Sequence, residues 1–126
     1  MYGELEGGEK PRDLKERTKR FSLQVIRCVE KLPNSKANIV LSNQMLRSAT
    51  SVSANYGAAG VARSKKEFIA KAQIAREEAD ETQYWAELLC EINSCFSSDL
   101  SLVLNEAREF TAILTATIRM ARENLT

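Results

Sequence analysis

The sequence predicts an all-α protein that folds as an antiparallel, up-down-up-down four-helix bundle. Three observations predict this fold class. The 126 residues include only 5 Gly and 2 Pro, so few residues interrupt helices. Apolar residues recur every three or four positions in four segments, which is the period of an amphipathic helix. The links between these segments are short, so consecutive helices should lie side by side in opposite directions. We expect residues 11–126 to form the bundle and residues 1–10 to form a flexible tail.

The first predicted helix begins at Pro11 and ends at Pro33 and Asn34, because proline cannot continue a helix. Asp13 is its expected N-cap, and Glu16, three residues later, can complete a capping box. Its apolar stripe consists of Leu14, Thr18, Phe21, Val25, Cys28 and Leu32.

The second predicted helix runs from about Ile39 to about Ala59, and Gly57 and Gly60 favour its end there. Its stripe consists of Leu41, Met45, Ala49, Val52, Tyr56 and Ala59.

The third predicted helix runs from about Lys65 to about Asn93, with Ser64 as its N-cap and Glu67 as the capping-box partner. Its stripe consists of Phe68, Ala72, Ala75, Ala79, Thr82, Ala86 and Leu89. Because alanine lets a neighbouring helix approach closely, we expect this face to lie against the second helix.

The fourth predicted helix runs from about Asp99 to about Asn124. Its stripe consists of Leu100, Leu104, Ala107, Thr111, Leu114, Ile118, Ala121 and Leu125. Six further apolar residues are candidates for a second buried surface: Leu23, Ile26, Trp85, Leu88, Phe110 and Ile113. Apolar surface in excess of one core usually has a partner, so we expect a homo-oligomer.

The composition excludes several classes of site. There is no histidine, which excludes a Ser-His-Asp triad, a Cys-His pair, His-ligated zinc and Glu-x-x-His di-iron sites. The three cysteines, Cys28, Cys90 and Cys95, are odd in number and none are spaced Cys-x-x-Cys, which disfavours disulfides and zinc. We find neither a signal peptide nor a membrane span, and we expect a cytoplasmic protein without cofactor, metal or catalytic residue.

The net charge of +1 conceals a marked asymmetry. Residues 10–36 contain nine Lys or Arg and three Asp or Glu, whereas residues 76–110 contain two Lys or Arg and nine Asp or Glu. A basic surface could bind nucleic-acid phosphates, pair with the acidic surface of another subunit, or simply be solvated. The candidate nucleic-acid contacts are Arg17, Lys19, Arg20, Arg63, Lys65 and Lys66.

A line of polar residues follows the core stripe of the second helix. If the next turn centres near residue 62, positions whose numbers sum to about 125 lie level, so Arg47 should face Glu78, with Glu81 one turn further on. The resulting pair should be partly buried and could either fix the helix register or line a polar groove that binds a ligand. The residues of this candidate groove are Arg47, Ser51, Asn55, Glu78 and Glu81.

The same carboxylates allow an enzymatic hypothesis. The segment 77–81 matches Glu-Glu-x-x-Glu, and Glu106 and Glu109 match Glu-x-x-Glu. Carboxylates at this spacing share a helix face and could hold Mg²⁺, as in all-α nucleoside triphosphate pyrophosphohydrolases, to whose magnesium site these clusters are similar. The second cluster of that family normally ends in Asp, whereas Glu109 is found here.

Residues 12–120 as a whole resemble a bacterial family. The matching blocks are Asp13 to Thr18 with Phe21, Leu32-Pro33, Leu46 to Tyr56, Ala62 to Phe68 with Lys71, and Ile74 to Trp85 with Glu87 to Leu89. They resemble the small proteins encoded within intervening sequences of 23S ribosomal RNA genes. One departure is Ser53, where Gly is more usual.

This resemblance implies a four-helix bundle that assembles as a ring-like homopentamer and has no assigned enzymatic activity. It also implies a distant relation to the accessory variability determinant of diversity-generating retroelements, which works beside a reverse transcriptase and binds nucleic acid through a positive surface. We therefore expect a non-enzymatic oligomeric bundle that binds RNA, DNA or a ribonucleoprotein. The alternatives are a scaffold for a protein partner and a Mg²⁺-dependent pyrophosphohydrolase.

Overall fold

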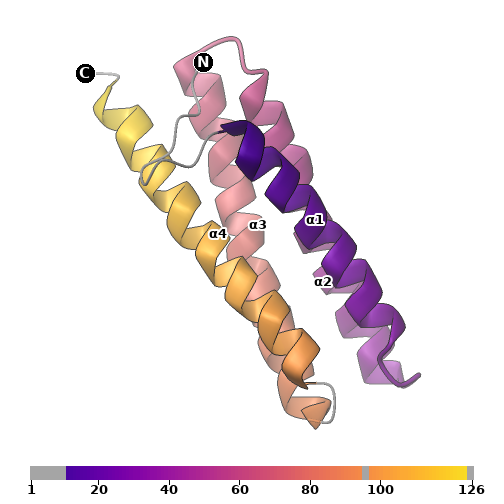
Figure 1. Cartoon of the computed structure of the whole chain (residues 1–126). Coiled ribbons are helices and arrows are strands. Elements are labelled where there is room, and N and C mark those ends of the chain that lie inside the picture. The colour runs from indigo at the N-terminus through magenta and orange to yellow at the C-terminus, as the bar shows by residue number, and fades with distance from the viewer. Residues whose placement is uncertain (1–10, 95–96, 125–126) are drawn as a thin grey trace.

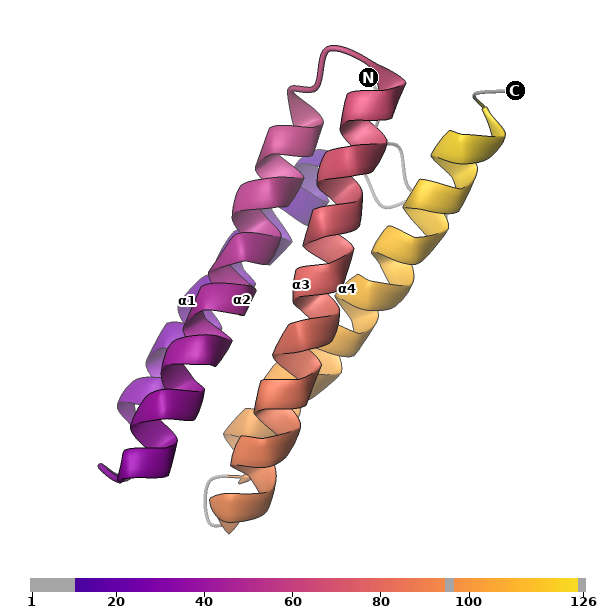
Figure 2. The same ribbon diagram turned by 180° about the vertical axis from the view of Figure 1, so that it is seen from behind.

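The structure, a computed structural model, describes residues 11–94 and 97–124, and within these ranges it contains four α-helices and no strand. They are α1 (Pro11–Glu30), α2 (Lys36–Gly60), α3 (Lys65–Ile92) and α4 (Ser97–Glu123). Successive helices run in opposite directions, as Figure 1 and Figure 2 show. The all-α, up-down-up-down four-helix bundle is therefore confirmed. The tail predicted at residues 1–10 lies outside the described residues, as do Cys95 and Leu125.

The four helices contact one another unequally. α3 packs along both α2 and α4, whereas α1 packs mainly on α2 and touches α4 over a shorter stretch. None of these helices combines the length and the apolar composition that a membrane crossing requires in the described part of the chain.

Side chains that satisfy free backbone N–H groups decide where the middle helices begin. The Ser64 side chain accepts a hydrogen bond from the Glu67 N–H at 3.1 Å, which confirms the predicted N-cap of α3. Ser35 caps α2 in the same way through the Asn38 N–H, so α2 begins before Ile39, the predicted start.

The predicted N-cap of α1 is wrong, although the helix begins at Pro11 as expected. Asp13 lies inside the first turn and therefore cannot be the N-cap. Proline suits the first helical position because the missing N–H has no partner there in any helix. The carboxylate of Asp13 still lies near the positive end of the helix dipole.

Most residues of the predicted stripes are buried in the core, whereas Leu32, Leu41, Leu104 and Thr111 are half-buried. The side chains of Phe21 and Phe110 meet edge to face, with ring centroids 5.2 Å apart. Phe110, predicted to belong to a second apolar surface, is instead fully buried in the bundle because α1 covers it. The largest fully buried side chains are Leu14, Phe21, Val25, Met45, Val52, Tyr56, Phe68, Leu89, Leu100, Val103, Phe110 and Leu114.

Small side chains allow α2 and α3 to pack closely, as their alanine-rich stripes predict. Ala49 and Ala79 are fully buried, and the buried hydroxyls of Ser48 and Thr82 share a hydrogen bond of 2.8 Å between the two helices. At the far end of this contact, the amides of Asn38 and Asn93 exchange two buried hydrogen bonds of 2.8 and 2.7 Å. Polar pairs inside an apolar contact favour one register, because sliding the helices would leave buried groups unpaired.

We expect Ala79→Leu to lower the free energy of unfolding by about 1–3 kcal/mol, because a larger side chain cannot fit between α2 and α3 without displacing them. Urea denaturation followed by circular dichroism measures the change. Ala70→Leu is the matched control, because Ala70 is exposed on the same helix and its replacement should change stability by about 0.5 kcal/mol or less. Equal stability of the two variants would contradict a close α2–α3 contact.

Candidate functional site

An arginine bridges α2 and α3 in the middle of the bundle. Arg47 Nη1 donates to Glu78 Oε2 at 3.0 Å, and Arg47 Nη2 pairs with Glu81. Trp85 Nε1 also donates to Glu81, at 3.0 Å. The Glu78 side chain is 16% exposed and that of Arg47 is 50% exposed, so the pair is partly buried. This is the arrangement that the helix register predicts from the position of the turn.

The other two residues of the candidate groove hydrogen-bond to each other and are not bonded to this cluster. The Asn55 side-chain amide donates to the Ser51 carbonyl and hydroxyl oxygens, both at 2.9 Å. These bonds remain within α2. The structure therefore brings together Arg47, Glu78 and Glu81, and it leaves Ser51 and Asn55 outside their cluster.

A second arginine bridges α1 and α4. Arg17 makes two parallel hydrogen bonds to the Glu106 carboxylate, both of 2.8 Å, and it approaches Glu109 at 3.2 Å. Its guanidinium lies over the Phe110 ring, 5.1 Å from the centroid. Both charged side chains of the main pair are only 22% exposed. Arg17 therefore links α1 to α4, and because carboxylates already compensate its charge, it is poorly placed to bind a phosphate. The sequence predicts Arg17 as a nucleic-acid contact, but it does not reveal the pairing of Arg17 with Glu106.

These two bridges occupy the carboxylate clusters that suggested a magnesium site. Glu78 with Glu81, and Glu106 with Glu109, each hold one guanidinium group. Within residues 11–94 and 97–124, no group of three or more carboxylate or thiol side chains converges as metal ligands. The carboxylate spacing that suits a cation therefore serves here to bind an arginine of the neighbouring helix.

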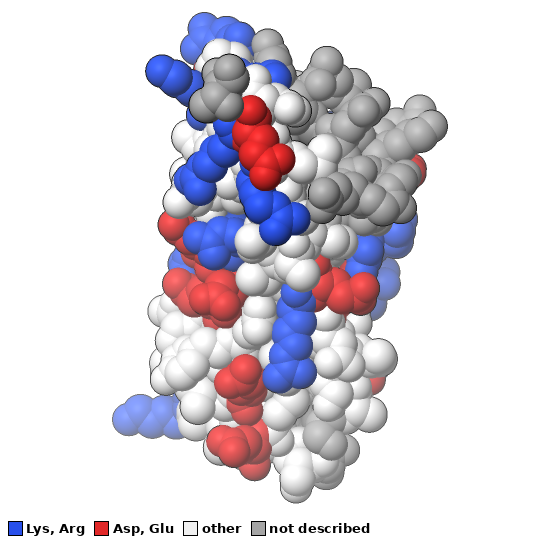
Figure 3. All heavy atoms as spheres, turned by 90° about the vertical axis from the view of Figure 1, so that its left-hand side faces the viewer, with Lys and Arg blue, Asp and Glu red and all other residues white. Residues whose placement is uncertain are grey.

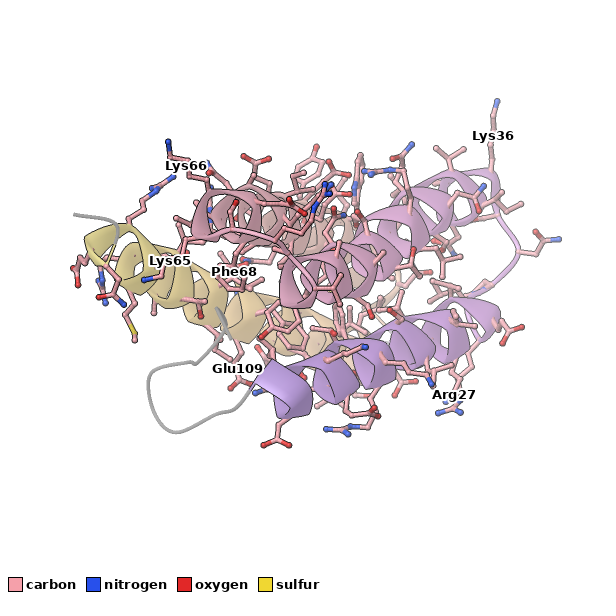
Figure 4. All side chains as sticks on the ribbon, turned by 90° about the horizontal axis from the view of Figure 1, so that it is seen from above. Arg27, Lys36, Lys65, Lys66, Phe68 and Glu109 are labelled. Carbon is pink, nitrogen blue, oxygen red and sulfur yellow. The ribbon has the colours of Figure 1, made fainter. Side chains whose placement is uncertain are left out.

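The remaining predicted basic residues form two separate groups. Lys19 and Arg20 are exposed on α1, close to Arg17, which lies level with the middle of α4. Arg63, Lys65 and Lys66 surround the α2–α3 turn at one end of the bundle, and the labels for Lys65 and Lys66 mark this end in Figure 4.

Three arginines that sequence reasoning did not select lie at the same end of the bundle. Arg122 of α4 donates to Gln73 of α3 at 3.1 Å, which aligns the last turns of α4 with the first turns of α3. Figure 3 shows basic side chains gathered over the upper part of one face, with acidic groups more frequent below them. We call this group of six residues the basic end: Arg63, Lys65, Lys66, Arg76, Arg119 and Arg122.

Two features of the sequence indicate this group. Arg119 and Arg122 are spaced i, i+3, and antiparallel packing of the third and fourth helices brings Arg76 near their level. The charge pattern alone hides the group, because Arg76 begins the acidic segment 76–110 and the two arginines of α4 follow that segment.

Apolar side chains are exposed toward the opposite end of the bundle. They come from the end of α1, the start of α2, the end of α3 and the start of α4. The exposed fractions reach 55% for Ile92 and 58% for Leu102. We call this group the apolar end: Leu23, Ile26, Ile39, Val40, Ile92 and Leu102. Leu23 and Ile26 were predicted for a second apolar surface, whereas Trp85, Leu88 and Ile113 from the same prediction are half-buried.

The cysteine thiols that the structure describes are poor nucleophiles. Burial raises the pKa of the Cys28 thiol to about 11, and it also raises the pKa of Cys90. Because the thiolate is the reactive form, both side chains remain protonated near neutral pH. This agrees with a packing role for Cys28 in the core.

Comparison with known proteins gives consistent results. The family model described as 23S rRNA-intervening sequence protein matches residues 12–116, which include parts of all four helices. The chain is also similar to the crystal structure of a protein with unknown function from the S23 ribosomal protein family of Bacteroides thetaiotaomicron VPI-5482. The identity is 32%, the TM-score is 0.77, and the match covers 86% of this chain and 97% of that one. No curated protein matches the chain.

We expect the two arginine bridges to differ in strength. Arg17→Met should lower the free energy of unfolding by about 1.5–3 kcal/mol, because it removes two parallel hydrogen bonds made by an arginine side chain that is itself only 22% exposed. Arg47→Met should cost about 1 kcal/mol or less, because water screens the half-exposed Arg47 side chain. Chemical denaturation measures both changes, with the exposed Arg20→Met as the control. A larger loss for Arg47→Met would contradict the assignment of the stronger bridge to α1 and α4.

Proposed function

Because the chain belongs to the family of 23S rRNA-intervening sequence proteins, we propose that it is a non-enzymatic, oligomeric bundle that binds RNA through its basic end. The observation that carries this proposal is the gathering of six basic residues at one end of a chain whose net charge is only +1. Phosphate contacts by Lys and Arg provide most of the sequence-independent affinity of proteins for nucleic acid.

The ion pairs distinguish the basic end from the other arginines. Arg17 and Arg47 each contact two carboxylates of a neighbouring helix. At the basic end, Arg63 approaches Glu67 at 3.7 Å, but its side chain is 91% exposed, so this pair is weak. Positive charge that is not neutralised within the protein attracts an anionic polymer.

The aromatic residues near this end indicate how RNA would be recognised. Tyr56 and Phe68 are almost fully buried, and Figure 4 shows Phe68 within the bundle. Since neither ring is available for base stacking, we propose contacts with the phosphate backbone and not with the bases. Such binding depends strongly on salt concentration and little on nucleotide sequence.

Self-association is the second part of the proposal, and the apolar end supports it. Six large apolar residues exposed toward one end of a small bundle favour burial against another molecule. We propose that the occupant is a second copy of this chain in a ring-like homopentamer. A ring would present several basic ends to one RNA, and multivalent contact increases the effective affinity. The competing occupant is a different protein, for which the bundle would serve as a scaffold.

We expect the triple variant Arg63→Gln/Lys65→Gln/Lys66→Gln to bind single-stranded RNA more weakly at about 50 mM salt, with the slope of log K against log salt reduced by about 2 in magnitude. The matched control, Arg27→Gln/Lys31→Gln/Lys36→Gln, removes the same charge from the opposite end, which is marked in Figure 4 by Arg27 and Lys36. Filter binding measures the affinity of both variants for a single-stranded RNA of about 20 nucleotides, which is longer than a typical binding site of about 4–16 nucleotides.

The variant Lys19→Gln/Arg20→Gln measures the contribution of α1 in the same assay. A wild-type protein without affinity for RNA at low salt would refute the proposed function, and equal losses in the two triple variants would refute the assignment to the basic end.

We expect Ile39→Glu/Leu102→Glu to shift the protein toward the monomer, because the new charges would be buried without partners in a subunit interface. Light scattering coupled to size exclusion at micromolar concentration measures the mass. Val61→Glu is the control, because Val61 is 78% exposed beside the basic end. A monomeric wild type would contradict self-association, and an oligomer unaffected by the double substitution would exclude the apolar end as its interface.

A further inference from the structure

A pocket of about 330 Å³ lies between the first half of α3 and the last turns of α4. Arg76 lines it from α3, and Arg119 and Arg122 line it from α4. The neighbouring lining residues are Gln73, Thr115, Ile118 and Glu123. Three arginines and one glutamate from two helices thus line the same pocket.

Two of these arginines, Arg76 and Arg122, have no carboxylate partner among the described residues. Arg76 makes no ion pair with any residue of the ranges 11–94 and 97–124. Arg122 is held by a neutral partner, because its Nη2 donates to the Gln73 amide oxygen at 3.1 Å. Like charges at close range repel one another, and a bound anion would relieve this repulsion.

The pocket has the chemistry of an oxyanion site. Arg119 and Arg122 are three residues apart and therefore share one side of α4. Arg76 belongs to the antiparallel neighbour α3, so arginines of both helices line the same pocket. Thr115 donates its hydroxyl proton to the Thr111 carbonyl at 2.7 Å, so the guanidinium groups and the side-chain amide of Gln73 are the donors for a ligand. Guanidinium forks match phosphate oxygens in pairs, which favours phosphate over a spherical anion such as chloride.

The size of the pocket and the nature of its walls restrict the ligand further. About 330 Å³ is at the small end of ligand sites, large enough for a phosphate and the sugar that carries it. The wall contributed by Ile118 is apolar, and no aromatic residue lines the pocket for base stacking. We propose that Arg76, Arg119 and Arg122 form a phosphate-binding site that holds one phosphate group of RNA, either within the strand or at its 5′ end. This inference rests on the proposed function and places one defined contact within the basic end.

Inorganic phosphate tests the pocket without RNA. We expect phosphate to raise the melting temperature of the wild type above that in sodium chloride of equal ionic strength, because binding to the folded state stabilises it. The variant Arg76→Gln/Arg119→Gln should lose this rise. The control Arg27→Gln/Lys36→Gln removes equal charge at the other end of the bundle and should retain it. Circular dichroism in chloride establishes that each variant is folded.

RNA then distinguishes the two sources of phosphate. We compare 5′-phosphorylated and 5′-hydroxyl forms of one 20-nucleotide RNA, a length that spans a few single-stranded binding sites of about 4–16 nucleotides. If the site holds an internal phosphate, the pocket variant should lose affinity for both forms, with a salt slope smaller by about 1.4 for two lost contacts. If it holds the terminal phosphate, only the 5′-phosphorylated RNA should bind the pocket variant more weakly.

The pocket and the proposed function can fail independently. A wild type that responds equally to phosphate and chloride, or a pocket variant that retains the phosphate response, would overturn the pocket. RNA binding that persists in that variant would then leave the rest of the basic end as the RNA contact. Conversely, a response to phosphate that the variant loses, without RNA binding by the wild type, would support the pocket and refute the proposed function.

Discussion

The contact between α2 and α3 is the constraint on which the rest of the structure depends. Alanines bring the two helices close together, and the buried Ser48–Thr82 and Asn38–Asn93 hydrogen bonds favour one register. That register places Arg47 beside Glu78 and holds the α2–α3 turn, with its basic residues, at one end of the bundle. Since closely packed interiors tolerate little displacement, a shift here would displace both the Arg47–Glu78 pair and the basic residues of the α2–α3 turn.

The arginines of this chain have two different roles, and their neighbours determine which. Arg17 and Arg47 each contact two carboxylates that are spaced three residues apart on a neighbouring helix, so carboxylates of the same chain compensate their charge. Arg76 and Arg122 face mainly neutral groups and other arginines. This difference explains how a chain with a net charge of +1 can present a strongly basic surface. The mean charge of a protein is a poor guide to its local electrostatic potential.

The two ends of the bundle differ in chemistry, and the antiparallel topology produces this difference. Each end gathers the termini of four helices that are far apart in sequence. One end combines basic residues of the α2–α3 turn, α3 and α4, and the other combines exposed apolar residues of all four helices. In the proposed assembly, the apolar end joins the subunits and the basic end contacts RNA, so the two surfaces do not compete.

Four features could be predicted from the sequence: the helices, most of their buried stripes, the Ser64 cap and the pairing of Arg47 with Glu78. These features depend on local periodicity, on side chains within one turn of each other, or on a short turn that fixes the register of consecutive helices. The sequence did not determine the Arg17–Glu106 bridge, the burial of Phe110 or the arginine pocket. No turn connects α1 to α4, so only three-dimensional packing sets their register. The pocket in turn depends on how far α4 extends along α3, and the side chains at their contact decide this in the folded bundle.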